Sequence, residues 1–308
     1  MKKLFSAFVF FAFSINLILA QASQEYVFRV MVSSGKNEIK KSESWQPLRT
    51  GNKLSLTDQI QIETGSFLGL AHKSGKTIEL KTPGVYKISD IASKINSATA
   101  SAAQKYADFV VAQMTKDGGK TINQRKGTTG STERAIPGAI KALLPYSVTC
   151  NVFEEKTNVV WYTHTGTKEY SVNLMNLFDE SVLKKVTKDT TLVIDFADEV
   201  FKKENDYKIL IKSNDVTGKS SGDGYSFHKL NANEKEEIEK EIKVIKQTDT
   251  EESSLQKIVL ASFYEDKKLY LEALKKYKEA IAMEPEVSEY KLMYQEFLER
   301  YGMTKVKK

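Results

Sequence analysis

The spacing of hydrophobic and polar residues changes three times along the chain. Between residues 26 and 90, short runs of alternating apolar and polar residues lie between glycine turns, which is typical of half-buried strands. The run Gln-Ile-Gln-Ile-Glu at 59–63 places both isoleucines on one face. The runs 67–72 and 77–81 flank a loop containing a glycine, and this predicts a hairpin because glycine adopts positive φ. We therefore expect a small all-β domain in residues 23–91.

The period becomes helical in residues 92–117. An amphipathic helix is expected there, ended by Gly118. We expect it to dock on the β domain or on another copy, since its polar face is too poor in lysine and arginine to favour a membrane. The polar, glycine-rich residues 118–136 predict a linker. We therefore expect residues 92–144 to consist of the amphipathic helix and a flexible linker. The apolar face is formed by Ala102, Tyr106, Phe109, Val110, Gln113 and Met114.

A second β region is expected in residues 145–231, with turns between its strands. Six or seven short strands at this spacing are typical of an antiparallel β-sandwich. The strand-like runs are 148–152, 159–163, 170–174, 192–194, 207–211 and 225–227.

Residues 232–308 have the period of helices. Asn233 is expected to cap the first helix, and Ser253 or Ser254 the second. A last helix at 288–301 carries an aromatic stripe ended by Gly302. The predicted fold is multi-domain, mainly β in its N-terminal and middle parts and all-α at its C-terminal end. The stripe consists of Tyr290, Tyr294, Phe297 and Tyr301, and the first helix buries Ile238, Ile242 and Ile245.

The first residues predict export. Lys2 and Lys3 precede an apolar run at 4–20, and Ala20-Gln21-Ala22 supplies small residues for cleavage. We expect a signal peptide at 1–22, cut before Ser23 or directly after Ala20, and a periplasmic or secreted protein. The alternative is an anchor that stays in the membrane. Since no cysteine stands directly after the apolar run, a lipid-anchored form is not expected.

Charge and cysteine content narrow the classes of function. The chain has 46 basic and 40 acidic residues, and removal of Lys2 and Lys3 leaves a net charge of +4, too small for a nucleic-acid-binding surface. No nucleic-acid or nucleotide partner is expected, and membrane contact only indirectly. Cys150 is the single cysteine, so the chain forms no internal disulfide, and its alternating surroundings predict a small core residue.

The N-terminal β domain resembles FecR-like domains, which are periplasmic modules named for the iron-dicitrate transport regulator. The resemblance covers about residues 26–90 and implies a small all-β module used in sensing or envelope scaffolding. The chain departs from the regulator, because no cytoplasmic segment and no spanning helix precede the module. The pattern is carried by Trp45, Leu48, Gly51, Leu54, Asp58, Ile60, Thr64, Gly75, Ile78 and Leu80.

Two further resemblances concern the later regions. Trp161 followed by the strands at 170 and 207 resembles an immunoglobulin-like or fibronectin type III-like sandwich, without the paired cysteines of immunoglobulin domains. The tail resembles one tetratricopeptide repeat at 255–285, with Lys257 in place of the usual early aromatic. The repeat-like positions are Leu260, Ala261, Tyr264, Ala273, Tyr277, Ala280 and Pro285.

Candidate chemistry is sparse. Gly118-Gly119-Lys120-Thr121 matches the last residues of a phosphate-binding loop, but Met114 stands where the first glycine of that motif is required. The three histidines lack the paired spacing of zinc ligands and are expected on strand surfaces. The carboxylates near 195–199 offer an acid and a base for glycoside cleavage, but residues of this kind more often cap or face solvent. The residues in question are His72, His164 and His228, and Asp195, Asp198 and Glu199.

We therefore expect a non-enzymatic scaffold or adaptor of the bacterial envelope. It would bind envelope proteins or cell-wall components, without a cofactor, a metal or a catalytic residue, and the sequence does not identify its binding residues. The first alternative is a periplasmic ligand sensor that acts through a membrane partner, and the second is a cell-wall hydrolase.

Overall fold

The computed structural model describes residues 26–95, 101–115, 139–146, 148–246 and 253–304. The predicted signal peptide, the linker at 118–136 and the Gly118–Thr121 motif lie outside the described residues. Every described helix falls short of the length or the hydrophobicity that crossing a bilayer requires.

The N-terminal β unit consists of two four-stranded antiparallel sheets, with strand orders β4-β1-β6-β7 and β3-β2-β5-β8. The predicted alternation at 59–63 is confirmed, since Ile60 and Ile62 are buried. The predicted hairpin is confirmed as β6 and β7, with Gly75 at φ 90°. The unit comprises β1 (Phe28–Ser34), β2 (Asn37–Lys41), β3 (Ser44–Pro47), β4 (Lys53–Leu54), β5 (Gln59–Ile62), β6 (Phe67–His72), β7 (Thr77–Leu80), β8 (Gly84–Lys87) and the short helix α2 (Ile88–Ala92).

The helix predicted at 92–117 is α3 (Ser101–Thr115). Tyr106 and Val110 are buried as expected, but Phe109 is 39% exposed and does not belong to the buried face. That face runs instead through positions 103, 106, 107, 110 and 111. α3 contacts β1 and β6 of the N-terminal unit, and it also contacts helices of the tail. Docking is therefore observed on two units at once.

The middle β unit has a five-stranded sheet in the order β12-β11-β14-β15-β9 and a two-stranded sheet, β10-β13. The expectation of a purely antiparallel arrangement is wrong, because β15 pairs with β9 in parallel. Periodicity shows which residues share a face and does not show strand direction. The strands are β9 (Cys150–Val152), β10 (Lys156–Val160), β11 (Tyr170–Met175), β12 (Ser181–Thr187), β13 (Thr191–Asp195), β14 (Asp206–Ser213) and β15 (Tyr225–Lys229), with the 3-10 helix η1 (Glu199–Phe201) between β13 and β14.

The tail folds into α5 (Ala232–Lys246), α6 (Ser254–Asp266), α7 (Tyr270–Met283) and α8 (Ser288–Arg300). Asn231, and not Asn233, caps α5. The Asn231 side chain accepts hydrogen bonds from the main-chain N–H groups of Asn233 and Glu234. Ser253 caps α6. Gly302, at φ 65°, ends α8 as expected.

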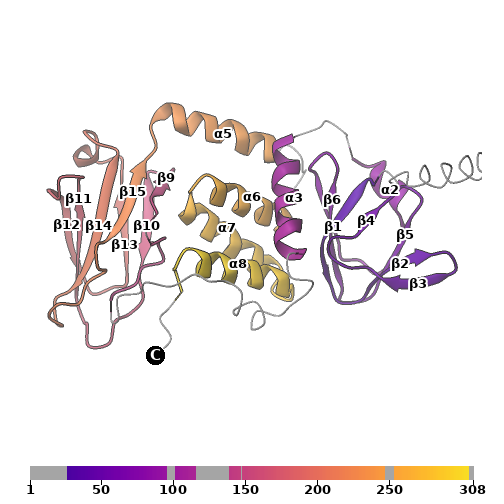
Figure 1. The fold of residues 1–308 in the computed structure, drawn as a ribbon, viewed down its shortest axis with the longest axis horizontal. Coiled ribbons are helices and arrows are strands. Elements are labelled where there is room, and N and C mark those ends of the chain that lie inside the picture. Colours follow the sequence, from indigo (N-terminus) through magenta and orange to yellow (C-terminus); the bar gives the residue numbers. More distant parts are fainter. Residues whose placement is uncertain (1–25, 96–100, 116–138, 147, 247–252, 305–308) are drawn as a thin grey trace, which may run out of the picture.

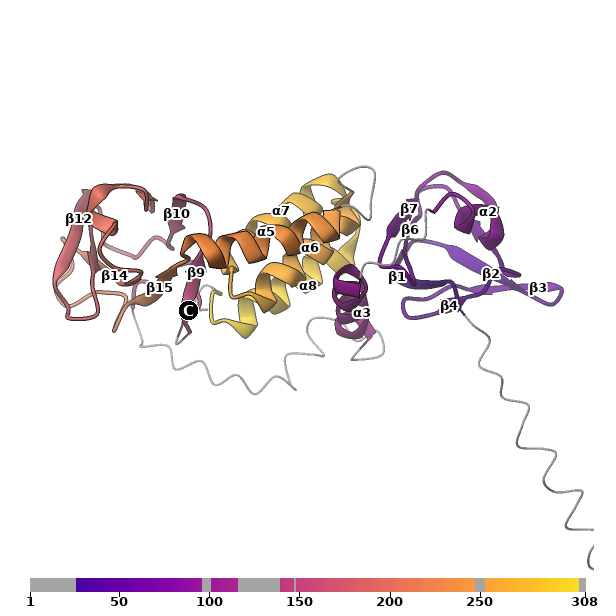
Figure 2. The ribbon, with the colours of Figure 1, turned by 90° about the horizontal axis from the view of Figure 1, so that it is seen from above.

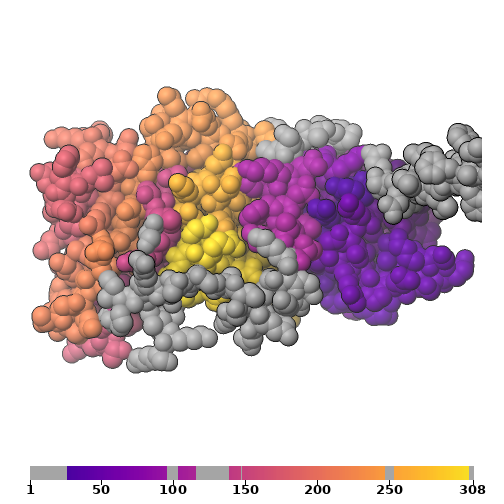
Figure 3. All heavy atoms as spheres, viewed as in Figure 1, coloured from indigo at the N-terminus to yellow at the C-terminus, as the bar shows by residue number. Residues whose placement is uncertain are grey.

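The helices lie between the two β units (Figures 1 and 2). Buried residues of β1, β6, α3, the middle sheets and the tail helices form one continuous hydrophobic cluster, and the N-terminal unit has a second core of its own. In the space-filling view the helices touch both β units (Figure 3). The N-terminal and middle parts are thus built of β-sheets and the C-terminal part of helices, as the sequence predicts.

Candidate functional site

The structure does not bring the three histidines together. His72 is buried, which corrects its expected place on a strand surface; its Nδ1 lies 2.7 Å from Ser74 Oγ. Burial, with help from Lys73 and Lys76, lowers its pKa. His228 lies between Asp206 and Glu234, with Nδ1 2.8 Å from the aspartate.

His164 lies in a loop, with Nδ1 3.3 Å from Thr167 Oγ1. Across the described residues, no group of three or more histidine, cysteine or acidic side chains is placed to hold a metal ion.

The carboxylates near the end of β13 serve local structure. Asp195 accepts a hydrogen bond from the main-chain N–H of Ala197. Asp198 caps η1 by accepting from the N–H of Val200, and Glu199 pairs with Lys202. These contacts are formed with residues two or three positions away, as in capping and turn motifs, and Asp195 also lies 3.8 Å from the Lys156 ammonium of the paired strand β10.

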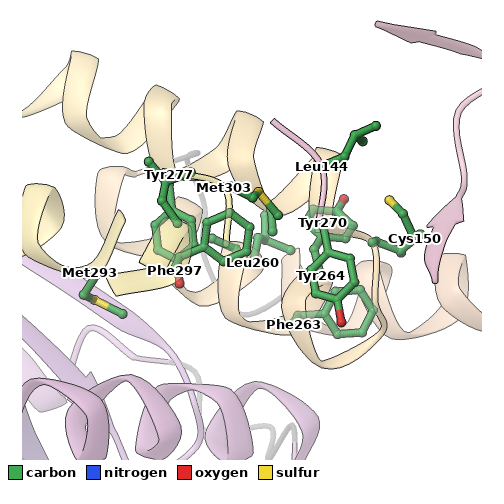
Figure 4. Packing of buried hydrophobic residues seen from close by; sticks show 14 of the residues in the cluster. Leu144, Cys150, Leu260, Phe263, Tyr264, Tyr270, Tyr277, Met293, Phe297 and Met303 are labelled. Carbon is green, nitrogen blue, oxygen red and sulfur yellow. The ribbon is translucent and has the colours of Figure 1, made fainter. Parts of the chain in front are cut away.

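The aromatic stripe of the tail is part of the interior. Tyr290 and Phe297 are fully buried, and the ring of Phe297 lies 5.2 Å from that of Tyr277 (Figure 4). Beneath them the buried carboxylate of Glu265 pairs with Arg300 and accepts from the hydroxyl groups of Tyr277 and Tyr301. Tyr290 and Phe297 of the stripe are therefore covered within the chain, whereas Tyr294 and Tyr301 stay partly exposed.

One joint connects the N-terminal unit to the tail. Glu79 of β7 accepts a hydrogen bond of 2.7 Å from the Ser254 hydroxyl and another of 2.7 Å from the Leu255 N–H, so a residue of one unit caps a helix of another. Lys81 bridges Glu79 and Glu284.

A second joint connects the tail to the middle unit. The N–H of Asn151 donates to the carbonyl of Lys268, and its side-chain amide donates to the carbonyl of Lys267. Tyr146 N–H donates to the carbonyl of Tyr301, and the Tyr162 hydroxyl donates to that of Met303. This joint therefore depends mainly on main-chain carbonyl groups of the helical tail.

Glu272 of α7 and Cys150 of β9 are buried inside this second joint. Glu272 interacts with the main chain of Phe153 and Glu154, while its buried Oε2 has no hydrogen-bond partner among the described residues. Burial, together with the charge of Glu154, raises the pKa of Glu272 to about 7. Burial and the nearby Glu272 raise the pKa of Cys150, whose thiol is free. The expectation of a core cysteine is confirmed, and Figure 4 shows it beside Tyr270.

The outer end of the middle unit carries an exposed apolar turn. Leu177 is 72% and Phe178 80% exposed, between β11 and β12. The turn is held from inside by Asn176, whose Oδ1 accepts from the N–H groups of Phe178 and Glu180. Its side-chain amide donates to the Glu180 carboxylate. Two large apolar side chains are thus presented to solvent on a fixed turn.

β12 forms the outer edge of the five-stranded sheet (Figure 1), and within the part of the chain that the structure describes it pairs with β11 alone. Alternation does not predict this strand, since Lys184 and Lys185 interrupt the apolar pattern. The binding candidate that the sequence pattern did not indicate is therefore this edge together with the Leu177–Phe178 turn.

The chain matches no protein-family model and no curated protein.

Proposed function

We propose that this protein is an exported, non-enzymatic adaptor of the bacterial envelope, which holds two envelope components at a fixed separation. The proposal includes cleavage of residues 1–22 and a periplasmic or secreted location, as the N-terminal pattern favours.

One observation carries the proposal: a single hydrophobic cluster runs from β1 and β6 through the helices into the middle sheets. A shared core of this kind resists movement between units, whereas domains joined by polar interfaces move by default. The two β units therefore present their outer loops and edges from opposite ends of one body (Figure 2).

We further propose the finer assignments for the three parts: a FecR-like N-terminal module, an immunoglobulin-like middle unit and a tetratricopeptide-like tail. The pattern residues Leu48, Leu54 and Ile60 are buried, and Gly51 has a positive φ that favours glycine. Ala261, Ala273 and Ala280, fully buried, let α6 and α7 approach closely, which supports the repeat assignment. In the adaptor role the tail works as the connector, because Tyr290 and Phe297 of its aromatic stripe are buried in the shared core.

Photo-crosslinking in intact envelopes tests the adaptor proposal. A photoreactive amino acid is placed at exposed Val186 of the middle unit, at exposed Leu56 of the N-terminal unit, and at buried Leu260 as the control. We expect different adducts at the two exposed positions and none at the buried one. Adducts at neither exposed position would contradict the proposal. Incubation of the pure protein with peptidoglycan tests the hydrolase alternative.

A further inference from the structure

The edge strand β12 combines three features that suit the binding of an extended peptide: an unpaired edge, basic side chains and a neighbouring apolar turn. Among the described residues no strand pairs with its outer side, so main-chain N–H and C=O groups face outward there. Lys184, Lys185 and Val186 are exposed in succession, although consecutive residues of a strand point to opposite faces. Both faces of the strand are therefore open at this point.

Within β12 itself the only charged residues are basic, Lys184 and Lys185, while the acidic residues Asp179, Glu180 and Asp189 lie outside the strand, before and after it. Lys184, Lys185 and Lys188 are all exposed, and among the described residues none of them forms an ion pair. By contrast, Lys208 near the start of β14, which is separated from β12 by β11, pairs with Asp179. Lysines on an edge strand also prevent edge-to-edge association of identical chains, because like charges would then face each other. That pattern excludes a second copy of β12 and favours a strand that carries carboxylates.

An apolar contact lies at one end of this edge. The Leu177–Phe178 turn leads directly into β12, which begins at Ser181. Both side chains are largely exposed on a turn fixed by Asn176. A peptide that pairs with β12 and extends past its first residue therefore meets two apolar side chains.

We propose that β12 binds an extended acidic segment of a partner protein by strand addition. In an antiparallel pairing, two adjacent carboxylates face Lys185 and Lys184, and an apolar residue further along packs on Leu177 and Phe178. The inference rests on the proposed adaptor function and names the partner chemistry of its outer end.

A peptide probe tests the main-chain and charge requirements with the full mature chain. The probe is fluorescein-labelled Thr-Val-Glu-Glu-Val-Thr-Leu, followed by anisotropy, and the matched control carries N-methyl groups on alternate residues, which remove its donors. We expect the chain to bind the probe and not the methylated control. The affinity for the probe should be roughly tenfold weaker in the double variant Lys184→Glu/Lys185→Glu and unchanged in Lys184→Arg/Lys185→Arg. Equal binding of the methylated control, insensitivity to charge reversal, or no binding would overturn the proposal.

The crosslinking experiment separates this inference from the adaptor function. We expect the peptide captured at Val186 to be acidic, and the adduct to disappear in Lys184→Glu/Lys185→Glu. If Val186 gives no such adduct while Leu56 gives one, the strand-addition proposal fails and an adaptor role through other surfaces stands. If neither position gives an adduct, both fail.

Discussion

The two joints of the helical tail are built from different chemistry. The joint to the N-terminal unit uses side chains: Glu79 caps α6, and the ring of Phe67 lies 6.1 Å from that of Tyr290. The joint to the middle unit uses main-chain carbonyl groups and encloses Glu272, a buried carboxyl with one oxygen unpaired. The first joint should therefore respond to single substitutions, whereas the second should respond to pH.

The largest loss of stability is expected in the core between the tail helices, because these helices take part in both joints. Tyr277→Ala removes a buried ring that packs on Phe297 and whose hydroxyl donates to Glu265. We expect the free energy of unfolding to fall by about 4 kcal/mol. Tyr277→Phe, which keeps the ring, should cost only about 1 kcal/mol. Urea denaturation measures both values, and equal costs would show that packing does not dominate here.

The second joint is expected to weaken as pH rises. The pKa of Glu272 is raised from 4.5 to about 7 in the folded chain, so the folded state favours the neutral carboxyl. Its contribution to stability is full below the unfolded pKa and is lost as pH rises through about 7.

Glu272→Gln removes this titration. Relative to the wild type, the variant should gain roughly 3 kcal/mol in the free energy of unfolding between pH 4.5 and 8. Denaturation at a series of pH values measures the gain, with Glu43→Gln, at an exposed position of the N-terminal unit, as the control. A constant difference between wild type and variant across this range would contradict the raised pKa.

The first joint is expected to lose less from one change. Glu79→Ala leaves the Leu255 N–H and the Ser254 hydroxyl without their acceptor. Because these groups are buried, we expect a loss of about 2 kcal/mol. Glu63→Ala, which removes an exposed partner of Lys36, should cost about 0.5 kcal/mol or less. A similar cost for both would argue against Glu79 as the connecting cap.

The smallest effect is expected at a contact between the N-terminal unit and α3, which also packs on the tail helices. Asp108 of α3 pairs with Arg29 of β1 at 3.1 Å, and its side chain is 47% exposed. Solvent screens such a pair, so Asp108→Ala should cost about 0.5 kcal/mol and less at high salt. A thermal melt at two salt concentrations checks both statements. A loss above that of Glu79→Ala would reverse the ranking of the contacts.

Local patterns predicted most of the strands and helices of this chain. The alternation at 59–63 and the Gly302 stop are confirmed, because each depends on a few neighbouring residues. β3 was not predicted individually, since it is only four residues long. The parallel pairing of β9 with β15 depends on contacts between distant parts of the chain, which periodicity does not record.

The sequence did not predict the strand that we propose as a binding surface. The stripe around Phe297 shows the spacing of a buried helix face but not what covers it. β12 was missed because its lysines break the alternation, although these lysines are what make the edge distinctive. Glu79 gave no signal as a cap, because the helix that it caps begins 175 residues later in the chain.

The distance between the two β units tests the central claim, that the helical tail joins both of them in one body. Spin labels are attached at Glu43→Cys and Lys188→Cys, both exposed, while the native Cys150 is buried and stays unlabelled. Pulsed electron paramagnetic resonance then measures the distribution of distances between the labels. The account expects one narrow peak, and a broad or multiple distribution would contradict it.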